Sequence, residues 1–164
     1  MTRVGFGFDV HPFGEAAGRA LVLGGVEVPG GPSLEGHSDA DVLTHAVADA
    51  LLGALALGDL GQHFPDGDPR YRGISSQLLL GQVLERVRAA GGRVVNVDAT
   101  VVAEAPRLAE WLDPMQKRLA ATLQLAPARV SVKAKRAERL GALGRREGIA
   151  AMAVALVEVA EEPA

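Results

Sequence analysis

Cysteine is absent from this chain of 164 residues, and aromatic residues are scarce. Without cysteine there is no disulfide and no thiolate ligand, so any metal must be held by histidine, aspartate or glutamate, donors that suit zinc or a harder divalent ion. One tryptophan, one tyrosine and a formal net charge of −3 offer no platform for nucleic acid. No long uncharged apolar run is present, so we predict no membrane span and expect a cytoplasmic protein.

The chain has the length of one ordinary domain. It contains no internal repeat, linker or low-complexity tract, and we therefore predict a single domain over residues 1–164. Few large rings and 20 glycines limit the apolar surface that one copy can bury, which leaves association with further copies as an open alternative.

The order of predicted elements indicates an α+β domain with helices on one face of a mixed or antiparallel sheet, in a ferredoxin-like arrangement. Residues 2–13 alternate with the period of a half-buried strand, so Asp9 and His11 share a face. A helix is predicted over about 39–57, opened by a capping box at Ser38. The other expected elements are two short strands within 21–28, a mobile surface loop over 58–73, helices over 74–90 and 107–124, strands over 93–103 and 130–135, and a segment over 149–159 that suits either a helix or a strand.

A metal site is one interpretation of the Asp9-x-His11 pair. With His45 from the predicted helix, these side chains supply three ligands and leave a fourth tetrahedral position open, as catalytic zinc sites require. The alternative is a hydrogen-bonded pair at the end of a strand, without metal. Asp49, one helical turn after His45, either orients its ring or is an exposed carboxylate.

Two further groups suit an anionic ligand. His37 and Ser38 precede the predicted helix, where free N–H groups and the helix dipole favour phosphate, although Ser38 can equally be a simple cap. The segment after the 130–135 strand is basic and contains glycines that let its backbone approach a ligand, and a solvated basic loop is the alternative. Its cations are Lys133, Lys135, Arg136, Arg139, Arg145 and Arg146.

Several motifs, spaced along almost the whole chain, resemble those of one enzyme family. The first two are Gly7-Phe8-Asp9-Val10-His11 and Gly36-His37-Ser38-Asp39-Ala40-Asp41-Val42, with His45 one helical turn further on. Others lie at residues 49–53, 57–61, 64–66, 96–98, 105–107, 132–134, 138, 140–141 and 144–149. Together they resemble the 2-C-methyl-D-erythritol 2,4-cyclodiphosphate synthase family, and several motifs in one order are more specific than any single motif.

The resemblance implies a homotrimer with active sites between subunits, in the non-mevalonate route to isoprenoid precursors. It implies a cytidine diphosphate substrate, 4-diphosphocytidyl-2-C-methyl-D-erythritol 2-phosphate. The 2-phosphate attacks the β-phosphorus, CMP leaves, and an eight-membered cyclic diphosphate forms. An ionised phosphate needs no activated serine or cysteine, and a metal beside two phosphates offsets their repulsion and fixes an in-line geometry.

The resemblance also implies two metal sites. Asp9, His11 and His45 correspond to zinc ligands, and these residues also lie in the substrate-binding set. Glu138 corresponds to a carboxylate that holds Mg²⁺ or Mn²⁺ on the diphosphate and contacts the substrate.

The remaining roles concern the substrate. His37 and Arg136 are the expected catalytic residues, and His37 with Ser38 matches a pair that contacts the phosphate and erythritol parts. Residues 59–68 match an erythritol-binding segment and residues 103–109 a cytidine-binding segment. The other expected substrate contacts are Val10, Asp59, Leu60, Gly61, Phe64, Pro65, Asp66, Gly67, Asp68, Ala103, Glu104, Ala105, Pro106, Arg107, Leu108, Ala109, Lys135, Ala137, Ala142 and Arg145.

This chain departs from the family pattern at three positions. Arg136 stands where a phosphate-contacting threonine is usual, and it either replaces the hydroxyl donor by a charge or points away. Ala142 replaces a phenylalanine at the trimer axis, and Met152 stands where a glutamate pairs with the arginine matched by Arg145. These changes argue against binding of an isoprenoid diphosphate in the trimer cavity.

Two other functions compete with the cyclodiphosphate synthase. A zinc-dependent phosphoester hydrolase needs a general base beside a metal-bound water, for which Asp49 or Asp41 is the candidate. A metal-stabilised trimer without catalysis is the third interpretation.

Overall fold

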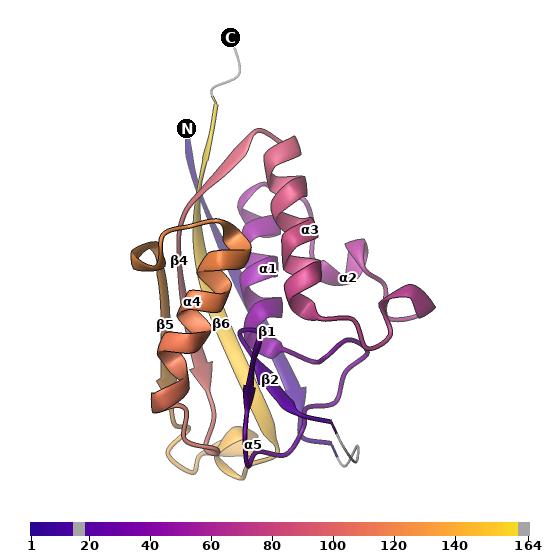
Figure 1. Cartoon of the computed structure of the whole chain (residues 1–164), viewed down its shortest axis with the longest axis vertical. Helices are drawn as coiled ribbons and strands as arrows, with labels where there is room; N and C mark the ends of the chain where they lie inside the picture. The colour runs from indigo at the N-terminus through magenta and orange to yellow at the C-terminus, as the bar shows by residue number, and fades with distance from the viewer. Residues whose placement is uncertain (15–18, 161–164) are drawn as a thin grey trace.

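A four-stranded sheet in the order β1-β6-β4-β5 organises the computed structural model, which describes residues 1–14 and 19–160 (Figure 1). Strand β6 runs antiparallel to both neighbours, β1 and β4, whereas β4 and β5 are parallel. The parallel step requires a crossover, which α4 supplies. The strands are β1 (Thr2–Pro12), β4 (Gly92–Val102), β5 (Val130–Lys135) and β6 (Gly148–Val159).

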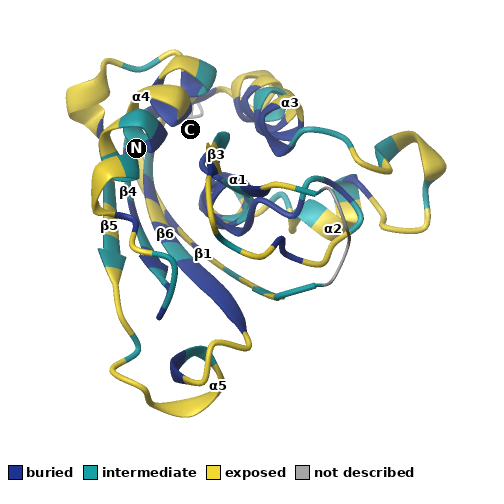
Figure 2. Ribbon diagram, turned by 60° about the horizontal axis from the view of Figure 1, so that its bottom comes forward, coloured by how far each residue is buried: buried dark blue, intermediate teal, exposed yellow. Residues whose placement is uncertain are grey.

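Three helices cover one face of this sheet, and most buried residues lie between the two layers (Figures 1 and 2). They are α1 (Val42–Ala54), α3 (Ser76–Ala89) and α4 (Leu112–Leu123). The smaller elements are a hairpin of β2 (Leu21–Leu23) and β3 (Val26–Val28), the short helices α2 (Leu60–His63) and α5 (Gly141–Gly144), and single 3-10 turns at Pro69–Tyr71, Ala109–Trp111 and Pro127–Arg129.

The predicted α+β domain with helices on a mixed sheet is confirmed. The order of elements differs from the β-α-β-β-α-β order of a ferredoxin-like domain, which corrects that part of the expectation. The β2–β3 hairpin and the three helices α1, α2 and α3 lie between β1 and β4, and only the short helix α5 lies between β5 and β6. The ambiguous segment 149–159 is a strand. Ala151, Ala153 and Ala155 are buried in the core that α1 covers, and the partner strands β1 and β4 satisfy the backbone of β6 on both sides.

Helix α1 begins three residues later than predicted, and its N-cap is Asp41 instead of Ser38. The fully buried Asp41 carboxylate accepts the Thr44 N–H at 3.0 Å and the N–H groups of Gly24 and Gly25 at 2.8 and 2.7 Å. Burial raises the pKa of this carboxyl above its ordinary value. Asp41 therefore ties the β2–β3 turn to the start of α1, which sequence spacing alone does not reveal.

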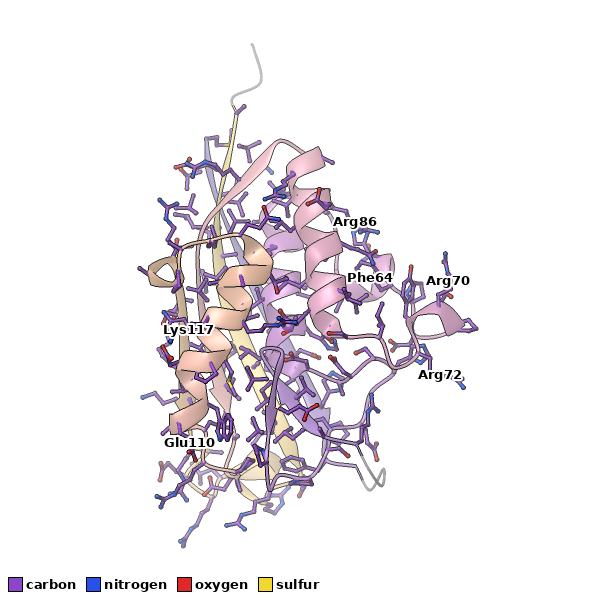
Figure 3. The ribbon with its side chains drawn as sticks, in the orientation of Figure 1. Phe64, Arg70, Arg72, Arg86, Glu110 and Lys117 are labelled. Atoms are coloured by element: carbon purple, nitrogen blue, oxygen red, sulfur yellow. The ribbon has the colours of Figure 1, made fainter. Side chains whose placement is uncertain are left out.

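The 58–73 segment is more ordered than predicted, since it contains α2 and a 3-10 turn. Asp59 caps α2 by accepting the Gln62 N–H at 2.9 Å. The Phe64 ring is buried, with Tyr71 edge-on at 5.3 Å and the Arg86 guanidinium over it at 4.8 Å (Figure 3). Arg86 belongs to α3, so the cation–π contact fastens this segment to the helical layer.

The two faces of β1 have opposite environments. Gly5 and Gly7 lie against α1 so closely that a Cβ on Gly7 would be 1.9 Å from the Ala46 carbonyl oxygen and one on Gly5 1.8 Å from that of Ala50. The opposite face is apolar but open, and it consists of Val4, Phe6, Phe8 and Val10, which are 49–64% exposed. The alternation predicted for residues 2–13 is confirmed, but the buried side is the glycine side.

No helix in the described part of the chain is long and apolar enough to cross a membrane.

Because a Cβ at position 7 would collide with backbone atoms of α1, Gly7→Ala is expected to destabilise the fold by about 3 kcal/mol. Gly53→Ala is the matched control. Gly53 lies on α1 at the same interface with β1, but a Cβ added there would be 3.7 Å from its nearest atom, the Phe6 carbonyl oxygen. Alanine there is expected to be neutral or to stabilise by about 0.5 kcal/mol. Urea unfolding measures both, and equal midpoints for Gly7→Ala and the unmodified chain would contradict the packing argument.

Candidate active site

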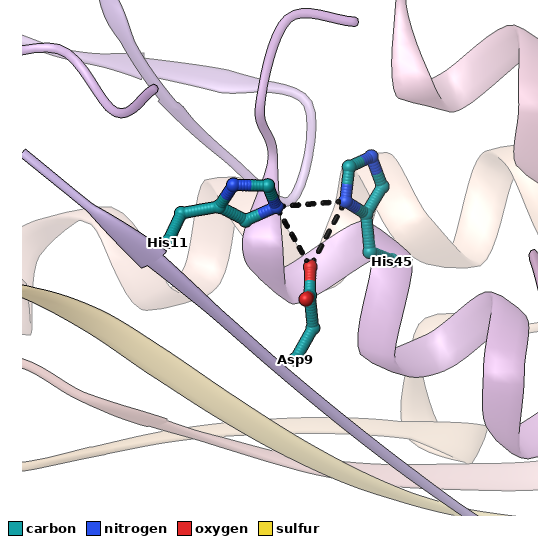
Figure 4. A group of neighbouring side chains, drawn as sticks. All are labelled: Asp9, His11 and His45. Atoms are coloured by element: carbon teal, nitrogen blue, oxygen red, sulfur yellow. Dashed lines mark hydrogen bonds and ion pairs between the residues drawn. The ribbon is translucent and has the colours of Figure 1, made fainter. Parts of the chain in front are cut away.

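Asp9, His11 and His45 converge on one point between β1 and α1 (Figure 4). Asp9 Oδ2 lies 2.9 Å from His11 Nε2 and 3.0 Å from His45 Nδ1, and the two ring nitrogens are 3.2 Å apart. The alternation of β1 points Asp9 and His11 toward α1, and the glycines on the same face let the helix approach closely enough for His45 to reach them. The predicted convergence of these three side chains is confirmed.

Outer hydrogen bonds fix which nitrogen of each ring faces the cluster. His11 Nδ1 lies 2.6 Å from the Glu35 carbonyl oxygen, which only accepts, so Nδ1 carries the proton. Ser76 donates its hydroxyl to the Asp39 carboxylate, so its oxygen, 2.8 Å from His45 Nε2, accepts from that ring. In the neutral rings, His11 Nε2 and His45 Nδ1 therefore carry no proton, and each presents a lone pair to the cluster.

Two lone pairs and a carboxylate oxygen within 3.2 Å of one another repel unless a cation lies among them. Tetrahedral zinc ligands at about 2.0–2.1 Å from the metal are about 3.3 Å apart, only slightly more than these separations. Two imidazoles and one carboxylate are a donor set typical of catalytic zinc. The residues present therefore fit a divalent metal.

The electrostatics of the cluster favour positive charge. Burial acts to raise the pKa of the Asp9 carboxyl, but the interactions with His11 and His45 outweigh it and hold that pKa well below its usual range. Burial acts to lower the pKa of His11, and its hydrogen bond and charge interaction with Asp9 reverse this, so the His11 pKa lies above its ordinary value. Asp9 is thus an anion at neutral pH.

The cluster lines an open cavity of about 220 Å³. His37 and Ser38, the residues expected to contact the substrate, border it. His37 Nε2 lies 3.1 Å from the Asp68 carbonyl oxygen, and the Ser38 hydroxyl lies 3.2 Å from His45 Nε2. Further lining residues are Gly36, Asp49, Leu60, Gly61, Phe64, Asp66, Tyr71 and Leu79, so part of the expected erythritol-binding segment faces the metal cluster.

Asp49 does not hydrogen-bond to His45. Its Oδ1 accepts the Leu60 N–H at 2.7 Å, and burial raises the pKa of this carboxyl. Asp49 thus anchors α2 at the cavity, and the helical spacing that suggested contact with His45 gives only its proximity.

Other expected residues lie outside this cavity. Glu138 is not among the metal-ligand group in the described part of the chain, and Arg136 is paired with Glu104 at 2.7 Å. Arg145 is paired with Glu147 at 2.6 Å. Ala103–Ala109 follows β4, Lys135 ends β5, Ala137 lies in the next loop, and Ala142 is exposed on α5.

Sequence reasoning missed the residues that orient the metal ligands. Ser76 at the start of α3 contacts His45, and Asp39 accepts both the Ser76 hydroxyl and, at 3.0 Å, its N–H. Asp39 was visible only as part of a motif, and Ser76 carried no signal because its contact spans 31 residues.

A cluster of three potential metal ligands lining an open cavity is an arrangement that fits the class of enzymes with a divalent metal in the active site. A model of the YgbB family matches residues 2–158. A 2-C-methyl-D-erythritol 2,4-cyclodiphosphate synthase from Alkalilimnicola ehrlichii is 59% identical over 157 residues, 96% of this chain and 95% of that protein.

Solved structures agree with these matches. The bifunctional IspDF from Campylobacter jejuni has a TM-score of 0.92 at 40% identity, and the match covers 98% of this chain and 43% of that one. IspF from Plasmodium falciparum in complex with CDP has a TM-score of 0.84 at 28% identity, covering 98% and 97%. The chain belongs to the YgbB family, and the resemblance inferred from its motifs is confirmed.

Removing the Ser76 hydroxyl is expected to weaken zinc binding by about 10- to 100-fold, because His45 Nε2 loses the nearer of its two hydroxyl partners, at 2.8 Å, and keeps only Ser38, at 3.2 Å. Ser75→Ala is the matched control, since Ser75 caps the same helix by accepting the Gln77 N–H without touching His45. Chelator competition gives the zinc affinity of each variant. Equal zinc affinities for Ser76→Ala and Ser75→Ala would contradict a specific role of the Ser76 hydroxyl in orienting His45.

Proposed function

We propose that this chain closes 4-diphosphocytidyl-2-C-methyl-D-erythritol 2-phosphate into 2-C-methyl-D-erythritol 2,4-cyclodiphosphate, with release of CMP, in the non-mevalonate route to isoprenoid precursors. The observation that carries this function is the convergence of Asp9, His11 and His45 in a cavity, in a chain 59% identical to a synthase of that product. The reaction is an intramolecular phosphoryl transfer, so the enzyme is a phosphorus–oxygen lyase.

Charge neutralisation and positioning dominate this chemistry, because the attacking phosphate is already ionised. A zinc ion held by Asp9, His11 and His45 supplies positive charge that offsets repulsion between the two phosphates. His37 and Ser38 contact the substrate at the cavity wall. The hydrogen bond between His37 Nε2 and the Asp68 carbonyl oxygen keeps the erythritol-binding segment close to the reacting groups.

A second group of residues handles the diphosphate and the nucleoside. Glu138 is an exposed carboxylate of the kind that holds Mg²⁺ or Mn²⁺ together with substrate phosphates. Lys135 and Arg136 supply cations beside it, and residues 103–109 form the proposed cytidine-binding segment. A substrate with several phosphate charges does not cross membranes, which agrees with a cytoplasmic enzyme.

The alternative of a phosphoester hydrolase is not favoured. Asp41, one candidate base, is fully buried and saturated by four hydrogen bonds from Gly24, Gly25 and Thr44. Asp49, the other, is engaged with the Leu60 N–H. Asp41 is therefore not free to activate a water on the metal, and one oxygen of Asp49 is occupied.

The active site is proposed to form between copies in a homotrimer. Asp9 and His11 lie on β1, one edge of the sheet, whereas Lys135 ends β5, the opposite edge. A cavity of about 220 Å³ is small for the whole substrate. Edge-to-edge association in a closed ring would bring the metal half of one copy to the diphosphate half of the next.

The open apolar face of β1 supports this assembly. Phe6 and Phe8 are 62% and 53% exposed, and the neighbouring strand adds Val154 at 42%. Contiguous exposed apolar surface of this kind marks an interface.

Replacing all three metal ligands, Asp9→Ala, His11→Ala and His45→Ala, is expected to reduce CMP release to background, because no charge then offsets the phosphate repulsion. The assay follows CMP and the cyclic product from the named substrate, with and without chelator. Unchanged turnover in the triple variant would refute the function, and linear phosphates in place of the cyclic product would indicate the hydrolase.

Placing a charge on the open face, as in Phe6→Glu, is expected to yield a monomer with at least about tenfold lower activity. Leu78→Glu is the matched control, because Leu78 is also 62% exposed but lies on α3 in the helical layer. Sedimentation equilibrium gives the masses. A trimer-sized Phe6→Glu, or a monomeric unmodified chain that is fully active, would exclude the proposed assembly.

A further inference from the structure

Glu104 is a buried carboxylate within the proposed cytidine-binding segment, 103–109. Its side chain is 2% exposed, and it lies just after the end of β4. Oε1 accepts from Arg136 Nη2 at 2.7 Å, and Oε2 accepts the Arg139 N–H at 3.4 Å. The Arg136 guanidinium lowers the pKa of Glu104, so the carboxyl is ionised at neutral pH and needs these donors.

The segment that Glu104 contacts has an unfavourable backbone. Glu138 and Arg139 have φ values of 53° and 62°, two successive non-glycine residues in the left-handed region. Such a conformation persists only where its surroundings hold it. Gly144 packs against Arg139, where an added Cβ would lie 2.2 Å from the carbonyl carbon, and the Leu140 N–H donates to the Ala137 carbonyl at 2.9 Å. The Glu104 carboxylate is the side chain that adds to these backbone contacts.

Arg136 is only partly used by this pair. A guanidinium carries five N–H donors in a fixed fork, and one hydrogen bond, to Glu104, engages it in the described part of the chain. The Arg136 side chain is 56% exposed. Further donors therefore remain for an anion at the surface, in an orientation that Glu104 sets.

We propose that Glu104 is a positioning residue, whose ion pair with Arg136 holds the 136–139 segment so that Arg136 and Glu138 meet the substrate's diphosphate. The proposal rests on the proposed function, because it concerns the same substrate. It also explains how an arginine stands where the family usually has threonine. A threonine at 136 alone would leave the buried Glu104 carboxylate without its cation, so the two positions are coupled.

The test is a double-mutant cycle on kcat/KM for CMP release, with Glu104→Gln, Arg136→Thr and the double variant. Each single change is expected to cost at least about tenfold, or about 1.4 kcal/mol. The double variant is expected to be no worse than the poorer single variant, because a glutamine leaves no buried charge. Losses that multiply, or single variants as active as the unmodified chain, would overturn the proposal.

A purely structural role is separated by the Mg²⁺ requirement. Glu104→Gln is expected to raise the Mg²⁺ concentration for half-maximal activity at least about fivefold, with zinc affinity unchanged, because the displaced 136–139 segment contains none of the three clustered zinc ligands. If Glu104→Gln does not fold, Arg136→Lys is measured instead. Arg136 is exposed, so this change keeps the positive charge but removes the planar guanidinium that can hydrogen-bond to Glu104 and to an anion at once. A normal Mg²⁺ requirement in the folded variant would overturn the proposal.

Glu158→Gln is the matched control. Glu158 forms another carboxylate–arginine pair, with Arg93, at the opposite end of the sheet, and no change in activity is expected. Hydrogen exchange of the 137–140 amides gives a readout without turnover. If the unmodified chain releases no CMP, the proposed function fails, whereas faster exchange in Glu104→Gln still supports the positioning and equal exchange overturns it.

Discussion

The contact between the glycine face of β1 and helix α1 is the constraint on which the rest of the structure depends. Because Gly5 and Gly7 carry no Cβ, the Ala46 and Ala50 carbonyls approach the strand directly. His45 precedes Ala46, and Asp9 follows Gly7 by two residues on the same face, so this contact also sets the distance between the metal ligands. A change in the packing of β1 against α1 would therefore also change the distances between Asp9, His11 and His45.

Much of the fold could be predicted from periodicity. Alternation in residues 2–13 and helical spacing in 74–90 each have one solution, and both elements form as expected. Segment 149–159 was ambiguous, because its alanines suit a helix and its valines suit a strand. The pairing with β1 and β4 decides that it is a strand. The capping residue of α1 was misassigned because aspartate and serine are both favoured at the N-cap, and the turn whose N–H groups select Asp41 lies 16–17 residues away in the chain.

The candidate site was predictable where its residues are chemically rare. Four histidines and no cysteine left few possible metal ligands, and three of the predicted side chains meet. The residues that orient them, Ser76 and the Glu35 carbonyl, were not predictable, since a serine hydroxyl or a backbone oxygen is common everywhere and acquires a role only from tertiary position. Similarly, nothing in the spacing of Glu104 and Arg136 suggests their ion pair.

The buried Asp41 carboxylate has a consequence for local stability. It joins the Gly24–Gly25 turn to the loop of residues 37–41, and Thr44 passes the connection on to Gln77 of α3, which in turn accepts from Thr122 of α4. Buried polar chains of this kind open as a unit, because each broken link leaves a desolvated partner. None of the β2–β3 hairpin residues lines the cavity, yet through Asp41 the hairpin is joined to the start of α1, the helix that carries His45.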